Sequence, residues 1–244
     1  NCHSYYSLRY GTMSVEQLVQ QAASAGAEAV TLTDINNSTA IPEFAGECIK
    51  NNIRPVAGIE FRNDNELQYV GIARNNSGLR ELNEFLSKLN FEKTPVPFPA
   101  PHFSNAYIIY SLYKSPGRKL FDNEHIGIKA EEVNRLLSLS SKDKNPEVIM
   151  QPVTFAGKDD IFIHRSLRAV DNNILLSHVK PWQCAGENEL FSSSDYLKRA
   201  FSGYPAIISN TEKLLGDCIL SFDRESQKNK NIFSASRYDD RLLL

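Results

Sequence analysis

Residues 29–34 read Ala-Val-Thr-Leu-Thr-Asp, and residues 55–60 read Pro-Val-Ala-Gly-Ile-Glu. Each stretch is a short apolar run that ends in a carboxylate, a pattern typical of a buried strand with an acid at its end. Strand ends converge on one site in α/β barrels, so we expect Asp34 and Glu60 to lie close together. An acid in this position also caps helices, and either residue alone is explained by that structural role as well.

Helical patterns surround these two runs. Ser14 and Gln17 form a capping-box pattern at the start of the first helix, and Gly26 supplies its end. Apolar spacing predicts further helices at 39–49, 79–89, 130–139, 159–174, 194–201 and 206–218, and further strands at 67–73, 106–110 and 148–150. This alternation of strands and helices predicts a parallel α/β architecture.

The chain reads as one domain followed by a linker. Four prolines force an extended loop at 94–104, and residues 221–240 are polar and aperiodic. We therefore expect a domain at 1–220 and an outgoing linker at 221–244. Residues 1–6 lack the basic and apolar regions of a signal peptide, and we expect them to lie inside a first strand.

Composition excludes several classes of protein. The sequence contains no apolar run long enough for a membrane span, so we expect no membrane partner. With 27 basic and 29 acidic residues, the formal net charge is −2, and a tight grip on DNA phosphates is not expected. The four cysteines have no zinc-like spacing and are expected to be reduced, which favours a cytoplasmic location.

Five segments, in order along the chain, resemble one known family. Residues 1–8, Asn-Cys-His-Ser-Tyr-Tyr-Ser-Leu, resemble the His-x-His-Ser-x-Tyr-Ser-Leu motif of the PHP domains of bacterial DNA polymerase III alpha subunits. Residues 31–37 resemble the motif Leu-Thr-Asp-His-Gly-Asn, and residues 54–61 are similar to Lys-Pro-Ile-x-Gly-x-Glu-Phe. The segments 68–82 and 196–211 resemble later parts of the same family. The resemblance implies a distorted seven-stranded, TIM-like (β/α) barrel of the PHP family, joined by the linker to a polymerase core.

Active PHP domains, as the resemblance implies, hold divalent zinc, manganese or magnesium ions on His, Asp and Glu ligands. Those ligand positions are mostly replaced in this sequence. They fall on Asn1, His3, Tyr10, Asp34, Ile35, Glu60, Gln68, Pro152 and Thr154. Only His3 and Glu60 retain the ligand type, with Asp34 as a nearby acid. Two ligands are fewer than the three or four that metal sites normally use, so we expect no metal, no cofactor and no catalytic residue in this domain.

The other histidines and the tryptophan have ordinary structural explanations. His164 is expected to pack or to form a hydrogen bond, and His102, His125 and His178 have no neighbouring ligand pattern. Trp182 is expected to be a packing anchor.

The sequence therefore predicts a non-catalytic domain of a replicative polymerase. The resemblance implies a structural role, with the polymerase core and the proofreading exonuclease subunit as partners in DNA replication. Nucleotidyl transfer, the activity of a DNA-directed DNA polymerase, would belong to the core. The alternative is an active metal-dependent PHP phosphoesterase: a proofreading nuclease, a pyrophosphatase or a phosphatase. An unrelated α/β barrel enzyme remains a third hypothesis.

Overall fold

A computed structural model describes residues 1–137 and 147–222 of this chain. Its centre is one six-stranded sheet in the order β1-β2-β3-β4-β5-β6. The strands are β1 (Ala29–Leu32), β2 (Arg54–Asn63), β3 (Glu66–Ala73), β4 (Ala106–Ser111), β5 (Glu124–Ile128) and β6 (Glu147–Ile149). The helices are α1 (Val15–Ser24), α2 (Ile41–Lys50), α3 (Asn76–Glu92), α4 (Asp160–Asp171), α5 (Ser194–Ala200) and α6 (Pro205–Asp217), with 3-10 helices η1 (Ala130–Leu137), η2 (Leu176–His178) and η3 (Pro181–Gln183).

The α/β class is confirmed, but the all-parallel sheet that we predicted is wrong at β3. This strand runs antiparallel to both β2 and β4, whereas β1–β2, β4–β5 and β5–β6 are parallel pairs. Asn63 pairs with Glu66, so only two residues connect β2 to β3, and Asp64 takes a positive φ of 50°. A loop this short can only make a hairpin, because a parallel connection needs about a dozen residues or more.

Seven strands were predicted, and the described residues form six. Single-residue bridges add to the sheet at the start of the chain. Cys2 forms parallel bridges with Leu32 at the end of β1 and with Val153 after β6. The N-terminal residues therefore lie between the two outermost strands of the sheet, next to β1.

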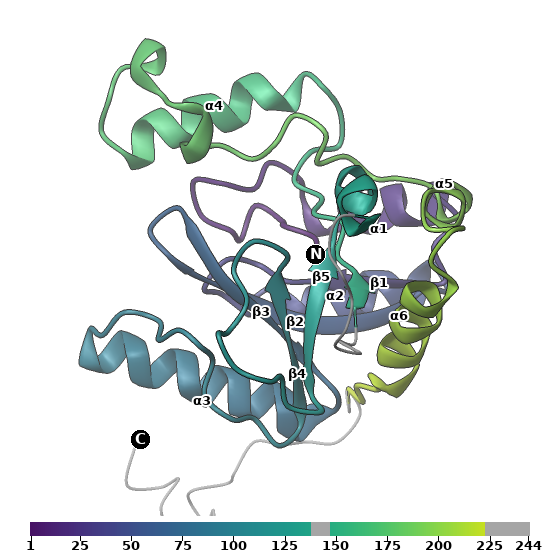
Figure 1. The fold of residues 1–244 in the computed structure, drawn as a ribbon. Coiled ribbons are helices and arrows are strands. Elements are labelled where there is room, and N and C mark those ends of the chain that lie inside the picture. Colours follow the sequence, from purple (N-terminus) through teal and green to yellow (C-terminus); the bar gives the residue numbers. More distant parts are fainter. Residues whose placement is uncertain (138–146, 223–244) are drawn as a thin grey trace, which may run out of the picture.

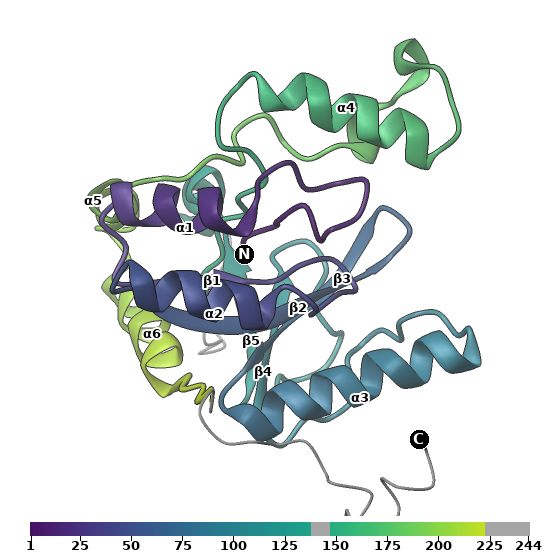
Figure 2. The same cartoon turned by 180° about the vertical axis from the view of Figure 1, so that it is seen from behind.

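The helices cover the sheet in separate groups (Figures 1 and 2). Helices α1 and α2 lie side by side and bury one apolar cluster together with β1, and α3 packs on β2, β3 and β4. Helix α6 lies against β6 and contributes Leu214 and Cys218 to a third cluster. Helix α4 and the turns after it stand at one end of the molecule. None of the helices in the described ranges is both long and apolar enough to cross a bilayer.

Most predicted elements are present, with shifts of a few residues at their ends. The capping box at Ser14 is formed, with Gln17 N donating to Ser14 Oγ at 3.1 Å. The predicted helix at 130–139 is the 3-10 helix η1, strand β5 was missed, and α4 ends earlier than predicted. Except for Ser221 and Phe222, the predicted linker lies outside the described residues.

Candidate functional site

The strand pairing brings the chain start, the end of β1 and the middle of β2 together. His3 N donates to Val153 O at 2.9 Å, Thr33 N donates to Cys2 O at 2.9 Å, and Glu60 N donates to Asp34 O at 3.2 Å. The convergence of His3, Asp34 and Glu60 at one place was predicted, and the structure has it. One detail differs, because Glu60 lies inside β2 rather than at its end.

Glu60 is the centre of this site. It is fully buried, and both carboxylate oxygens have partners. Asn1 Nδ2 donates to Oε2 at 2.6 Å, and His3 Nε2 lies 3.0 Å from the same oxygen. Arg62 Nε donates to Oε1 in a close ion pair. Three donors on one buried carboxylate satisfy the hydrogen-bonding requirement of a charged group removed from water.

His3 links Glu60 to a second carboxylate. His3 Nδ1 lies 2.9 Å from Thr154 Oγ1, and Thr154 Oγ1 donates to Glu189 Oε2 at 2.5 Å. A chain of side-chain contacts therefore runs from Glu60 through His3 and Thr154 to Glu189.

Arg62 lies two residues after Glu60 on the same strand, so both side chains project from the same face of β2. The guanidinium of Arg62 donates to the Tyr10 hydroxyl at 3.2 Å, and its central carbon lies 4.5 Å from the centre of the Tyr10 ring. Burial alone would raise the pKa of Glu60, but the charge of Arg62 and the neighbouring His3 outweigh it and hold the pKa of Glu60 well below its usual range. Glu60 is therefore a carboxylate at neutral pH.

Asp34 organises the loop that follows His3. Its two oxygens accept hydrogen bonds from Ser4 N at 2.7 Å, Ser4 Oγ at 2.7 Å and Ser7 Oγ at 2.6 Å. Burial raises the pKa of Asp34, and the hydrogen bonds from Ser7 and Ser4 oppose that rise. All of these contacts hold the loop at residues 4–7 against the end of β1.

The remaining predicted positions divide into two groups. Tyr10 and Thr154 join the cluster around Glu60, Ile35 forms a backbone bridge with Glu60, and the buried Pro152 lines the adjacent cavity. Gln68 does not join the cluster. It is buried on β3, but Lys114 Nζ donates to its Oε1 at 2.8 Å, and its amide donates to Glu66 O.

Two residues of the site were missed in the sequence. Arg62 could have been found from the two-residue period of a strand, because it follows Glu60 at that spacing. Glu189 had no signal, since it lies in an irregular segment far along the chain.

The structure confirms the role predicted for His164 and corrects that of Trp182. His164 Nδ1 lies 2.7 Å from Tyr10 O, and Ala185 N donates to His164 Nε2 at 2.9 Å, so both ring nitrogens have partners within the protein. Trp182 is 72% exposed and therefore is not a packing anchor. Trp182 lies in η3, and its side chain is part of the lining of the cavity beside Glu60.

The cavity beside the cluster is small. It measures about 170 Å³ and is lined by Glu60, Arg62, Tyr10, Asn1 and Pro152, among others. Ligand pockets usually measure about 300–1,000 Å³, so this cavity is too small to enclose a nucleotide.

Divalent metal ions do not fit the residues at this site. Within residues 1–137 and 147–222, no three or more His, Cys, Asp or Glu side chains are grouped as metal ligands. His3 and Glu60, the two positions that keep a residue able to bind a metal, are hydrogen-bonded to each other. A guanidinium also occupies the Oε1 side of Glu60, and its positive charge would repel a metal cation.

Comparisons with known proteins agree with the resemblance read from the sequence. The PHP domain family matches residues 1–123. The chain is 27% identical over 224 residues to a DNA polymerase III subunit alpha from Ureaplasma parvum serovar 3, an alignment that covers 89% of this chain and 20% of the relative. It is 33% identical over 122 residues to a DNA polymerase III subunit alpha from Staphylococcus aureus strain COL, covering 48% of this chain and 11% of the relative. The chain thus spans a fifth or less of the length of these relatives.

Among solved structures, this chain is similar to a Bifidobacterium adolescentis protein described as a candidate metal-dependent phosphoesterase. The structural alignment covers 88% of this chain and 96% of the Bifidobacterium chain. The TM-score of this alignment is 0.34 and the sequence identity is 12%.

Proposed function

The chain belongs to the PHP domain family, and on that premise we propose that it is a non-catalytic PHP domain with a structural and partner-binding role in bacterial DNA replication. One observation carries the proposal. The glutamate that the family would use as a metal ligand, Glu60, forms an ion pair here with the chain's own Arg62, and His3 and Asn1 occupy its other oxygen.

Metal-dependent phosphoester hydrolysis needs ions that activate water and offset the charge on phosphate. The positions that would supply further ligands are Asn1, Tyr10, Ile35, Gln68, Pro152 and Thr154 here. Two amides, a phenol bound to Arg62, an isoleucine, a proline and a threonine offer no anionic group to a metal. These substitutions support the loss of catalysis, and we propose that the domain holds no resident metal or other cofactor.

The similarity to polymerase subunits supports a place in the replicase. We propose that the domain works in the bacterial cytoplasm, packs against the polymerase core of the same polypeptide, and contacts the proofreading exonuclease subunit. In this arrangement residues 1–220 are the PHP domain, residues 221–244 lead to the core, and nucleotidyl transfer belongs to the core.

We also propose that the sheet is a seven-stranded, TIM-like barrel in which the residues around Cys2 hold the seventh position. Cys2 already bridges β1 on one side and the segment after β6 on the other, and both bridges are parallel. This pairing is what a strand between β1 and β6 would have.

Hydrolysis assays test the loss of catalysis. The wild-type chain, incubated with Mn²⁺ or Zn²⁺, is expected to release neither phosphate from phosphomonoesters nor mononucleotides from DNA, and Glu60→Gln and His3→Ala should change nothing. A metal-dependent activity of the wild type that both substitutions abolish would reject the proposal. It would establish the rival function, an active PHP phosphoesterase.

Binding measurements test the partner role. We expect the chain to co-elute with the polymerase core or with the exonuclease subunit, and to bind duplex or primed DNA weakly, because its net charge is −2. Submicromolar affinity for DNA at physiological salt, together with no binding to either protein, would contradict this role.

A further inference from the structure

An aromatic and basic surface lies outside the cluster around Glu60. It is formed by the proline-rich loop before β4 and by the connection from β4 to β5, residues 112–123. The chain as a whole has a net charge of −2, but residues 93–123 contain four basic side chains and one acidic side chain. The basic residues are Lys93, Lys114, Arg118 and Lys119, and the acid is Asp122. This stretch therefore carries a local excess of positive charge, which the proposed function does not use.

Three aromatic rings of this surface are open to solvent. Tyr113 is 62% exposed, Phe121 is 51% exposed and Phe98 is 37% exposed. Aromatic side chains stabilise a fold by being buried, and a group of exposed rings is typical of a surface that contacts another molecule. The two loops therefore present rings for which the fold itself has no use.

A cation lies over one face of each ring. The distances from the charged group to the ring centre are 4.1 Å for Arg118 over Phe121, 4.9 Å for Lys114 over Phe98 and 5.3 Å for Arg135 over Tyr113. Contacts of this kind orient both partners and place positive charge directly beside an exposed ring. Rings next to cations are what a nucleic-acid strand requires, because its bases stack on flat groups while its phosphates contact basic ones.

Hydrogen bonds hold the two loops together on β4. Ala100 N, in the proline-rich loop, donates to the Tyr110 hydroxyl at 3.1 Å, and that hydroxyl donates to Glu124 Oε1 at 2.8 Å. Arg118, in the other loop, binds both oxygens of Glu124 at 2.7 Å. The Phe98 ring packs edge-on against Tyr110, with the ring centres 5.7 Å apart. The surface is therefore fixed before a ligand arrives, which lowers the entropic cost of binding.

The positive charge of the surface is only partly neutralised by neighbouring acids. Lys114 pairs with Glu66 at 2.7 Å, and the Glu66 side chain is 69% exposed. Exposed ion pairs are weak, so Lys114 can also contact a phosphate. Lys119 is exposed, and within residues 1–137 and 147–222 it enters no ion pair. These two lysines are therefore the cations that an anionic strand can reach.

Exposed ring faces favour unpaired bases over a duplex. In a duplex the bases stack on one another and present only their edges, whereas in a single strand each base can stack on an aromatic ring or on a guanidinium plane. Stacking is also tolerant of sequence, because every base has a flat face. The surface therefore fits a single strand of any sequence.

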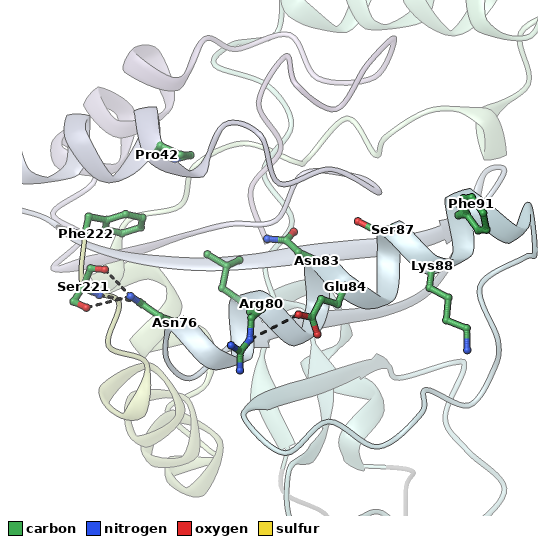
Figure 3. Close-up of a pocket in the computed structure, with 11 residues that line it drawn as sticks. Pro42, Asn76, Arg80, Asn83, Glu84, Ser87, Lys88, Phe91, Ser221 and Phe222 are labelled. Carbon is green, nitrogen blue, oxygen red and sulfur yellow. Dashed lines mark hydrogen bonds and ion pairs between the residues drawn. The ribbon is translucent and has the colours of Figure 1, made fainter. Parts of the chain in front are cut away.

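The groove along α3 has a different character (Figure 3). Its volume is about 910 Å³, and most of its lining residues are polar. Its basic side chains are balanced, because Arg80 pairs with Glu84 and Lys88 pairs with Glu92. This groove therefore offers no excess of positive charge, and Lys88 can serve as a control for the lysines of the 93–123 surface.

We propose that the 93–123 surface binds single-stranded nucleic acid. Bases stack on Phe121 and Tyr113, and Lys119 and Lys114 contact the phosphates. Because few charges take part, we expect a dissociation constant of about 10⁻⁶–10⁻⁴ M, the range of sequence-independent binding. Such an affinity agrees with the weak DNA binding proposed for the chain. The inference goes beyond the partner role and does not depend on the state of the metal site.

Fluorescence anisotropy tests the proposal. A labelled oligo-dT of about 12 nucleotides, within the usual site sizes, is titrated with the full 244-residue chain at low salt. Phe121→Ala should weaken binding about tenfold, the loss expected when one base loses its stacking partner. Phe121→Tyr should bind as the wild type does, because it keeps the ring. A blunt duplex of the same length should bind more weakly than the single strand.

The salt dependence tests the lysines separately from the rings. Lys119→Gln should reduce the slope of log K against log salt by about 0.7, the contribution of one phosphate contact on a single strand. Lys88→Gln on α3 is the matched control for charge, since the Lys88 side chain is 67% exposed. Phe162→Ala is the control for an exposed ring, because Phe162 is 66% exposed on α4. Both controls should leave the affinity and the slope unchanged.

Several results would overturn the proposal. Equal affinities of the wild type and Phe121→Ala would show that the ring binds no base, and equal losses for Phe121→Tyr and Phe121→Ala would show that stacking is not the cause. Tighter binding to the duplex than to the single strand would contradict the selection for unpaired bases. No binding at a protein concentration of about 10⁻⁴ M would remove the site altogether.

Discussion

Among residues 1–137 and 147–222, two buried glutamates form ion pairs with arginines, Glu60 on β2 and Glu124 on β5. Arg118 binds both oxygens of Glu124 at 2.7 Å, and the Tyr110 hydroxyl and Phe121 N donate to the same carboxylate at 2.8 Å each. Glu60 also has an arginine and two further polar partners, which are the Asn1 side-chain amide and a ring nitrogen of His3. Glu124 is not among the positions to which the resemblance assigns a metal ligand, and its partners are those of a structural carboxylate.

Glu60 is held in the same way as the structural carboxylate of Glu124. In both places burial would raise the pKa of the glutamate, and the neighbouring arginine and hydrogen-bond donors lower the pKa below its usual range. The two sites differ in exposure. Arg62 is almost completely enclosed, whereas 33% of the Arg118 side chain is exposed to solvent.

The largest expected effect follows from removing one arginine at a time. Arg62→Met should lower the free energy of unfolding by about 3–5 kcal/mol, because it leaves a buried carboxylate without its cation. Arg118→Met should cost on the order of 1 kcal/mol, since water can reach Glu124 once Arg118 is gone. Urea denaturation of the two variants measures both values. An equal or larger loss for Arg118→Met would break the distinction between the two sites.

The second effect concerns the coupling between Glu60 and Arg62. The double variant Glu60→Gln with Arg62→Met should be more stable than Arg62→Met alone by about 2 kcal/mol, because the uncompensated charge is removed together with its partner. The measurement is a double-mutant cycle of unfolding free energies. Additive losses would mean that the ion pair itself contributes nothing to the cluster.

A smaller effect separates Glu60 from Asp34 by pH. The folded pKa of Glu60 is lowered, so its contribution is complete above the unfolded pKa of 4.5 and is lost as the pH falls toward the folded pKa. The folded pKa of Asp34 is raised above the unfolded value of 3.8. The contribution of Asp34 to the free energy of unfolding is therefore complete below pH 3.8 and decreases as the pH rises from 3.8 through the folded pKa.

The stability penalty of Glu60→Gln should therefore shrink in acid, whereas that of Asp34→Asn, about 1–3 kcal/mol from a lost accepting oxygen, should grow. Unfolding curves between pH 3 and pH 7 test this, with Glu84→Gln as the baseline because the Glu84 side chain is exposed on α3. Penalties that change with pH in the same direction for both variants would contradict the assignment.

The sequence predicted more of the fold than of the site. Strong local signals, such as the capping box at Ser14 and the apolar runs of β1, β2 and β4, were sufficient for those elements. Strand β5 was missed because Glu124, His125 and Gly127 interrupt its apolar pattern. Strand β3 was predicted, but its antiparallel direction was missed because the two-residue turn at Asp64 carries no glycine, the usual signal of a hairpin.

At the site, the motifs correctly brought His3, Asp34 and Glu60 together. They could not show that Gln68 turns to Lys114, because that choice depends on a residue distant in sequence. Nor could they show that Glu189 reaches Thr154. Contacts of this kind are decided by tertiary packing, and a local pattern contains no information about them.

The effect of divalent metal on stability is the smallest expected, and it tests the central claim most directly. Mn²⁺ that binds the folded chain would raise the free energy of unfolding by about 2.7 kcal/mol at a hundred times its dissociation constant. Because Arg62 already neutralises Glu60, we predict identical urea unfolding curves with saturating Mn²⁺ and with EDTA. A stabilisation by Mn²⁺ that Glu60→Gln abolishes would contradict the account, since Glu60 would then be a metal ligand in spite of Arg62.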